Sequence, residues 1–318
     1  MTPEQVRTAP RRRHAYWHTA LTLAVLVAVA CLARRHWPLL ETGAVRLAAA
    51  DQGWLLVAAT ATLATWPCSA LAQQGAVLRR LPPGRLVAGQ FAACAAGHVL
   101  PAGLGAGAVN LRFLIRCGIP IAGAATAVAV KGTAGAIVRG ALIAVLVAAC
   151  PGVPHLPRVS GGLLITVGAV ATAAAAAAVA LSAGPLRARC RRALAGVRAY
   201  IAAVHARPAR AAALWGGSLA FVTLHCVVLI AVTRAVALPL PPARVALLHL
   251  AAGAVAALLP TPGGLGSLDA VLALALTAVG APAAAAASAV LGYRLLTVWL
   301  PLVPGLVVLA VLVRRRAL

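Results

Sequence analysis

The chain has 318 residues, of which 63% are apolar and only 10% are charged, and its net charge is +24. Soluble domains carry roughly 25% charged residues, so this composition excludes an ordinary soluble fold. The basic clusters lack interleaved aromatic residues and the chain has only four acids, so we expect neither nucleic-acid binding nor a metal site.

Apolar stretches of about 18 residues or more recur along the chain, and this length crosses a hydrocarbon core of roughly 30 Å. Lipid offers no hydrogen-bonding partners, so spanning segments are helices or closed barrels. The Ala/Leu/Val runs lack the alternation of barrel strands. The sequence therefore predicts an all-α polytopic integral membrane helix bundle. Its six full spans are expected at about residues 17–32, 54–71, 119–150, 161–181, 211–232 and 291–313.

We expect one transmembrane domain over residues 16–318, after a disordered basic tail at 1–15. No small-residue cleavage site precedes Arg34, so the first span is expected to remain as an anchor. An amphipathic basic helix is predicted at 186–207, and it suits either an anionic membrane surface or a solvated linker. Its apolar stripe consists of Cys190, Leu194, Val197, Ile201 and Val204.

Two apolar segments, at about 86–116 and 244–288, are interrupted by glycine and proline, which disfavour regular helix. We predict two re-entrant hairpins, the first entering from the cytoplasm and the second from outside. This plan resembles inverted-repeat transporters, in which substrate binds between broken helices; tightly packed kinked helices are the alternative. The predicted hairpin tips are Pro101, Gly103, Gly105, Pro260, Thr261, Pro262, Gly263, Gly264 and Gly266.

Basic residues are distributed unevenly between the predicted loops. With a cytoplasmic N-terminus, 19 of the 28 lysines and arginines fall on the inner side and six fall on the outer side. Positive charge accumulates on the cytoplasmic side of membrane proteins. The sequence therefore predicts a multi-pass protein of a bacterial plasma membrane with both termini in the cytoplasm.

Ionisable residues at membrane depth are costly and usually line a cavity. Asp269 follows the second break, and Arg294 lies in the last span beside Tyr293. We predict an Asp269–Arg294 pair that gates a pathway or holds a zwitterionic headgroup, unless it only fixes helix packing.

Asn110 and Arg112 follow the first break. A guanidinium binds phosphate oxygens with two parallel hydrogen bonds, so Arg112 is a candidate phosphate ligand or a cytoplasmic topology charge. Lys131 and Arg139 are eight residues apart, roughly on one helix face. They either add positive potential to the same pathway or extend to the membrane interface.

Enzyme motifs are missing from the sequence: it has no GxSxG, HExxH or GxxxxGK[ST] pattern and no paired carboxylates. The seven cysteines have neither metal-ligand nor redox spacing. We therefore expect no catalytic residues, no cofactor and no metal, and the chain is predicted not to be an enzyme.

Residues 260–270 (PTPGGLGSLDA) and 291–301 (LGYRLLTVWLP) resemble the C-terminal signature of the lysylphosphatidylglycerol synthase transmembrane-region family, also called flippase-like membrane proteins. The segment from Pro101 to Arg112 is similar to the family's N-terminal signature. The chain departs from the family at Ala106, where a glutamate is usual, and at Lys131-Gly132-Thr133, where an acid is usual. The resemblance spans about residues 15–315.

The resemblance implies a lipid-translocating region, with no soluble synthase domain expected after Arg316. Our leading hypothesis is a flippase for a polar-headed phospholipid or a polyprenyl-phosphate-linked lipid, so the expected partners are membrane lipids. Two alternatives are a secondary transporter of a small polar solute and a non-catalytic subunit that docks a separate synthase or glycosyltransferase.

Overall fold

The computed structural model describes residues 45, 48–99, 104–149, 187–257 and 267–314. The chain divides into two compact units, residues 1–49 and 50–318, and the helices discussed below belong to the second unit. Regular structure in the described ranges is helical throughout, with no strand. The predicted all-α class is confirmed.

Four described helices are long and apolar enough to cross a membrane. They are α3 (Gln52–Ala76), α6 (Ile121–Ala149), α9 (Pro208–Ala235) and the continuous segment Ala283–Arg314. These match four of the six predicted spans, and the other two, 17–32 and 161–181, lie outside the described residues. The last helix begins earlier than predicted because alanine, the best helix former, fills positions 283–287.

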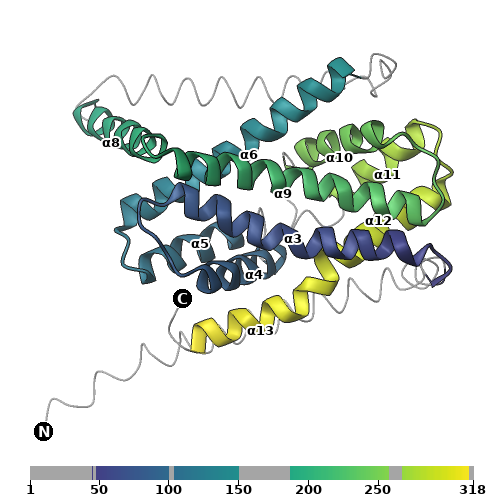
Figure 1. The fold of residues 1–318 in the computed structure, drawn as a ribbon, viewed down its shortest axis with the longest axis horizontal. Coiled ribbons are helices and arrows are strands. Elements are labelled where there is room, and N and C mark those ends of the chain that lie inside the picture. The colour runs from purple at the N-terminus through teal and green to yellow at the C-terminus, as the bar shows by residue number, and fades with distance from the viewer. Residues whose placement is uncertain (1–44, 46–47, 100–103, 150–186, 258–266, 315–318) are drawn as a thin grey trace, which may run out of the picture. The chain divides into compact units, whose positions relative to one another are not determined.

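Helices α3 and α9 pack side by side along much of their lengths (Figure 1). Glycines bring the two backbones together at two points. A Cβ atom on Gly217 would lie 2.6 Å from the Ala72 nitrogen, and one on Gly75 would lie 2.3 Å from the Leu214 nitrogen. Small residues allow such close approach between membrane helices. This crossing fixes which faces of α3 and α9 meet the other helices.

Two pairs of shorter helices pack as hairpins (Figure 1). The first pair is α4 (Pro83–Val99) and α5 (Leu104–Arg116), and the second is α10 (Pro242–Ala256) and α11 (Ser267–Ala278). At 1.5 Å per residue, α5 and α11 are only about 20 Å long, which is short of a full span of roughly 30 Å. Paired short helices fit the predicted broken hairpins, and the membrane face from which each enters stays a prediction.

Gly105, one of the predicted hairpin-tip residues, is buried in the first turn of α5, so the helix begins before it. A glycine costs a helix only about 1 kcal/mol relative to alanine, which packing offsets. Small residues also bring α4 and α5 together, since a Cβ on Gly97 would lie 3.2 Å from the Ala106 Cβ. The other predicted tips lie outside the described residues: Pro101, Gly103, Pro260, Thr261, Pro262, Gly263, Gly264 and Gly266.

The segment Ala283–Arg314 comprises α12 (Ala283–Arg294), the π-helical turn η3 (Leu295–Trp299) and α13 (Leu300–Arg314). Helix α12 packs against α9 and α11, whereas α13 packs against α4. A Cβ on Gly305 would lie only 3.0 Å from the Ala95 Cβ of α4. One long helix therefore contacts both short-helix hairpins.

Helix α8 (Arg187–His205) matches the helix predicted at 186–207. On its apolar stripe, Leu194, Val197 and Ile201 are exposed while Val204 is buried. The Tyr200 hydroxyl donates a hydrogen bond of 2.9 Å to the Ala76 carbonyl at the end of α3. The exposed apolar residues suit a helix lying on a membrane surface, and that location stays a prediction.

Candidate functional site

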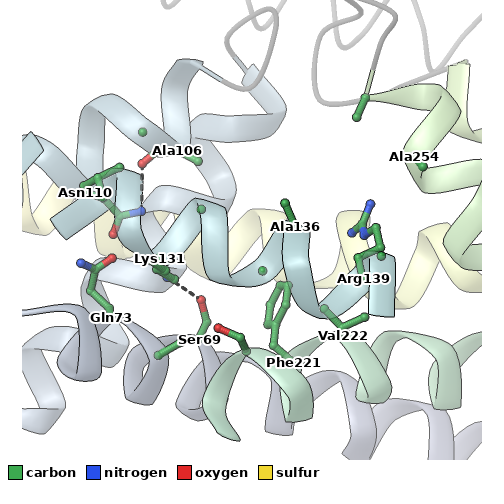
Figure 2. Close-up of a pocket in the computed structure, with 18 of the residues that line it drawn as sticks. Ser69, Gln73, Ala106, Asn110, Lys131, Ala136, Arg139, Phe221, Val222 and Ala254 are labelled. Carbon is green, nitrogen blue, oxygen red and sulfur yellow. Dashed lines mark hydrogen bonds between the residues drawn. The ribbon is translucent and has the colours of Figure 1, made fainter. Parts of the chain in front are cut away.

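A cavity of about 660 Å³ lies among α3, α5, α6, α9 and α10 (Figure 2). Binding sites for small molecules and headgroups typically measure 300–1,000 Å³. Its described lining is mostly alanine, glycine and other apolar side chains, and it holds no carboxylate. The polar and charged side chains among the described lining residues are Ser69, Gln73, Asn110, Lys131, Arg139 and Ser218.

Lys131 sits at the centre of a hydrogen-bonded network on the cavity wall. Its ammonium group donates to the Ser69 hydroxyl at 3.0 Å and to the Gln90 side-chain oxygen at 2.7 Å (Figure 2 shows the bond to Ser69). The Ser69 hydroxyl also donates to that Gln90 oxygen, at 2.9 Å. Both hydrogen-bond partners of Lys131 are neutral, so neither supplies a negative charge that would balance an ammonium group.

The network continues from Gln90 on α4 to Asn110 on α5. The Gln90 amide nitrogen donates to the Asn110 side-chain oxygen at 2.9 Å, and the Asn110 amide donates to the Ala106 carbonyl at 3.0 Å. Four helices, α3 to α6, therefore position one ammonium group. In each of these hydrogen bonds a donor faces an acceptor, so the network specifies the side-chain orientations.

Arg139 supplies the second cation of the cavity lining, two turns after Lys131 on α6. Eight residues correspond to about 12 Å along a helix axis. The Arg139 guanidinium approaches α10, where a Cβ on Gly253 would lie 2.9 Å from its terminal nitrogen. Gly253 thus leaves the room that the guanidinium occupies. Lys131 and Arg139 line one cavity, as their predicted shared face suggested.

Gln73 is fully buried on α3 and lines the same cavity, one turn after Ser69. Within the described part of the chain, neither polar atom of its side-chain amide has a hydrogen-bond partner. A buried amide without partners costs about 1–3 kcal/mol, so natural proteins rarely keep one without a reason. Gln73 therefore carries one donor group and one acceptor oxygen that no described residue satisfies.

Asp269 and Arg294 form the predicted ion pair, in which Arg294 Nε donates to Asp269 Oδ1. Asp269 lies in the first turn of α11 and Arg294 in the last turn of α12, where the arginine is buried. The adjacent Tyr293 is buried and packs edge-on against the His249 ring, with centroids 5.2 Å apart. None of these residues is among the described lining of the cavity.

The structure thus divides the predicted site residues into two groups. Asn110, Lys131 and Arg139 line the cavity, and Tyr293, Asp269 and Arg294 lie on α11 and α12 outside its described lining. Arg112 belongs to neither group, because it is exposed on α5 and does not line the cavity. Its role as a phosphate ligand stays a prediction.

Sequence reasoning missed Ser69, Gln73, Gln90 and Ser218. Ser69 and Gln73 are four residues apart in the sequence, a spacing that puts both on one helix face. That spacing was the available signal. Gln90 carried a weaker signal, a single amide in an apolar helix.

Comparison with known proteins adds one finding. The family model of the lysylphosphatidylglycerol synthase TM region matches residues 19–305. Among curated proteins, no sequence matches the chain. The family match covers nearly the whole chain and agrees with the apolar spanning helices. The chain therefore belongs to the lysylphosphatidylglycerol synthase transmembrane-region family and is a multi-pass integral membrane protein.

Proposed function

We propose that this protein moves a polar-headed lipid between membrane leaflets, with the headgroup passing through the cavity of Lys131 and Arg139. The cavity itself is the observation that carries the proposal. Charges inside a membrane are expensive and mark pathways for polar groups. A cavity of about 660 Å³ is large enough for a phosphate-containing headgroup, and the two cations on one of its walls have the charge that would bind the phosphate.

The surrounding helices support a role in transport. Short, broken helices provide substrate sites between the halves of many transporters, and here α5 and α10 from the two hairpins both contribute to the cavity lining. We assign the protein to a bacterial plasma membrane with both termini in the cytoplasm, and we assign it no catalytic step. The Asp269–Arg294 pair is proposed as a contact that changes when the pathway opens.

The test is lipid movement in reconstituted vesicles. Phospholipids with a fluorescent short acyl chain are incorporated, and a membrane-impermeant reductant reports how fast inner-leaflet lipid reaches the outer leaflet. The wild-type protein should exceed empty vesicles. Gly132→Leu should reduce that excess by about tenfold, because Gly132 lines the cavity, a Cβ there meets no neighbouring atom within 4 Å, and the rest of the leucine side chain would take up cavity volume.

Gly216→Leu is the matched control. Gly216 also has open space around its Cβ position, but it lines a separate, apolar groove between α6 and α9. This variant should move lipid like the wild-type protein. Wild-type rates equal to those of empty vesicles would refute the proposal. Uptake of a small polar solute that Gly132→Leu blocks would instead favour a solute transporter.

A further inference from the structure

The charges that face the cavity restrict which headgroup it can accept. Lys131 and Arg139 are both lining residues, and the described lining contains no acid. Asp269, the acid of the second hairpin's helix α11, is paired with Arg294 outside that lining. An amine-bearing headgroup would therefore meet two cations, whereas a phosphate would meet opposite charge, and like-charge contacts exclude wrong ligands strongly.

The hydrogen bonds around Lys131 leave capacity for an anion. An ammonium has three N–H donors, and Ser69 and Gln90 accept two of them. The Gln90 oxygen accepts from both neighbours, and its amide nitrogen donates to Asn110, so the network around the cation is built from neutral groups. The third donor of Lys131 is available to a phosphate oxygen.

Gln73 adds a neutral recognition point beside this charge. It lies one turn from Ser69 on α3, and both atoms of its amide are buried without a partner in the described structure. A side-chain amide pairs best with a group that both donates and accepts, such as a hydroxyl. A headgroup that combines phosphate with hydroxyl groups would complement both Lys131 and Gln73.

We infer that the cavity selects a lipid whose headgroup is a hydroxylated phosphodiester without an amine, with the phosphate at Lys131, further positive potential from Arg139 and a hydroxyl at Gln73. This inference rests on the proposed function for its lipid ligand. It adds the charge of the accepted headgroup and names Gln73 as a residue that sets specificity. Phosphatidylglycerol has this chemistry. Its lysyl ester carries added amines and is expected to be rejected, although the family is named after an enzyme that makes it.

Binding of four lipids to the purified full chain, by native mass spectrometry, tests the inference. The lipids are phosphatidylglycerol, phosphatidic acid, phosphatidylethanolamine and lysylphosphatidylglycerol, with matched acyl chains. Phosphatidylglycerol should bind about tenfold more tightly than either amine-bearing lipid. Gln73→Met should weaken phosphatidylglycerol about fivefold, to the level of phosphatidic acid, and leave phosphatidic acid unchanged. Thr60→Val, on an exposed face of α3, is the control.

A gain of binding guards against variants that are merely unstable. Gln73→Glu places a carboxylate in the cavity, so it should lower phosphatidylglycerol binding and raise lysylphosphatidylglycerol binding. Equal affinity of the wild-type protein for the anionic lipid and its lysyl ester would overturn the inference, as would a Gln73→Met variant that weakens all four lipids alike. Displacement by the water-soluble deacylated diester at equal concentration would overturn the assignment to a lipid.

The outcomes separate this inference from the proposed function. Selective binding of phosphatidylglycerol without any lipid movement in vesicles would refute translocation and leave the headgroup selectivity standing. Lipid movement that is indifferent to headgroup charge and to Gln73 would refute the selectivity alone.

Discussion

Gly75→Ala is expected to disrupt the contact between α3 and α9, which positions one side of the cavity. The added Cβ would lie 2.3 Å from the Leu214 nitrogen, 2.7 Å from the Leu214 Cα and 2.8 Å from the Arg210 carbonyl oxygen. Ordinary contacts at a Cβ are 3.4–4 Å, so the shortest distance is deficient by about 1.1 Å. All three atoms belong to the α9 backbone and cannot rotate away, so the helices must separate.

A separation of about 1 Å removes roughly a quarter to a half of the dispersion energy of each contact across the crossing. Overpacking typically costs about 1–3 kcal/mol, and a clash with backbone belongs at the upper end. We expect a loss of about 3 kcal/mol, which is roughly a hundredfold change in the folding equilibrium. The measurement is thermal unfolding in detergent, followed by the loss of the monodisperse peak in size-exclusion chromatography.

Gly216→Ala is the control, since Gly216 lies on α9, the other helix of this crossing, and a Cβ there meets nothing within 4 Å. It should be as stable as the wild-type protein or slightly more so, because alanine favours helix over glycine. Equal unfolding temperatures for Gly75→Ala and Gly216→Ala would refute the close crossing of α3 and α9.

Three further predictions concern other parts of the chain. Asp269→Asn should destabilise the protein by about 3 kcal/mol, since it leaves the buried Arg294 charge without its carboxylate. Thermal unfolding should show that the combined Asp269→Asn/Arg294→Met variant is less destabilised than the single variant. Burial raises the pKa of the Tyr200 hydroxyl in the folded protein. Its contribution to the free energy of unfolding is therefore complete below the unfolded pKa near 10 and is lost as pH rises through the higher folded pKa. The free energy of unfolding measured across pH 9–12 should fall more steeply for the wild-type protein than for Tyr200→Phe. In a background without native cysteines, a cysteine at Gly264 should react with an impermeant reagent from outside and one at Gly103 only from the cytoplasm, and labelling of both from one side would contradict opposed hairpins.

The sequence predicted the features that depend on composition and local pattern. Span length and apolarity identified α3, α6 and α9, and the glycine and proline breaks placed the two short-helix hairpins. The rarity of acids in the apolar segments led to Asp269 and Arg294 as a pair, although they are 25 residues apart.

The cavity could not be predicted in the same way, because its lining depends on how the helices are rotated about their axes. Gly75 and Gly217 set the rotation of α3 against α9, and this rotation turns Gln73 and Ser218 into the cavity. Nothing local to Gln73 indicates that its amide lacks partners. Arg112 illustrates the same limit. Its residue type suits a phosphate ligand, but the rotation of α5 leaves it on the exposed face of that helix.

The π-helical turn at Leu295–Trp299 has a consequence for the face that the C-terminal helix presents. Buried positions recur at Ala286, Val290, Arg294, Val298, Pro301 and Gly305. These cover 19 residues in five turns (305 − 286 = 19), whereas five α-helical turns of 3.6 residues contain 18. The π turn absorbs the surplus residue and keeps the buried stripe in phase from α12 to α13. The π turn comes directly after Arg294. It therefore separates α12, which packs against α9 and α11, from α13, which packs against α4.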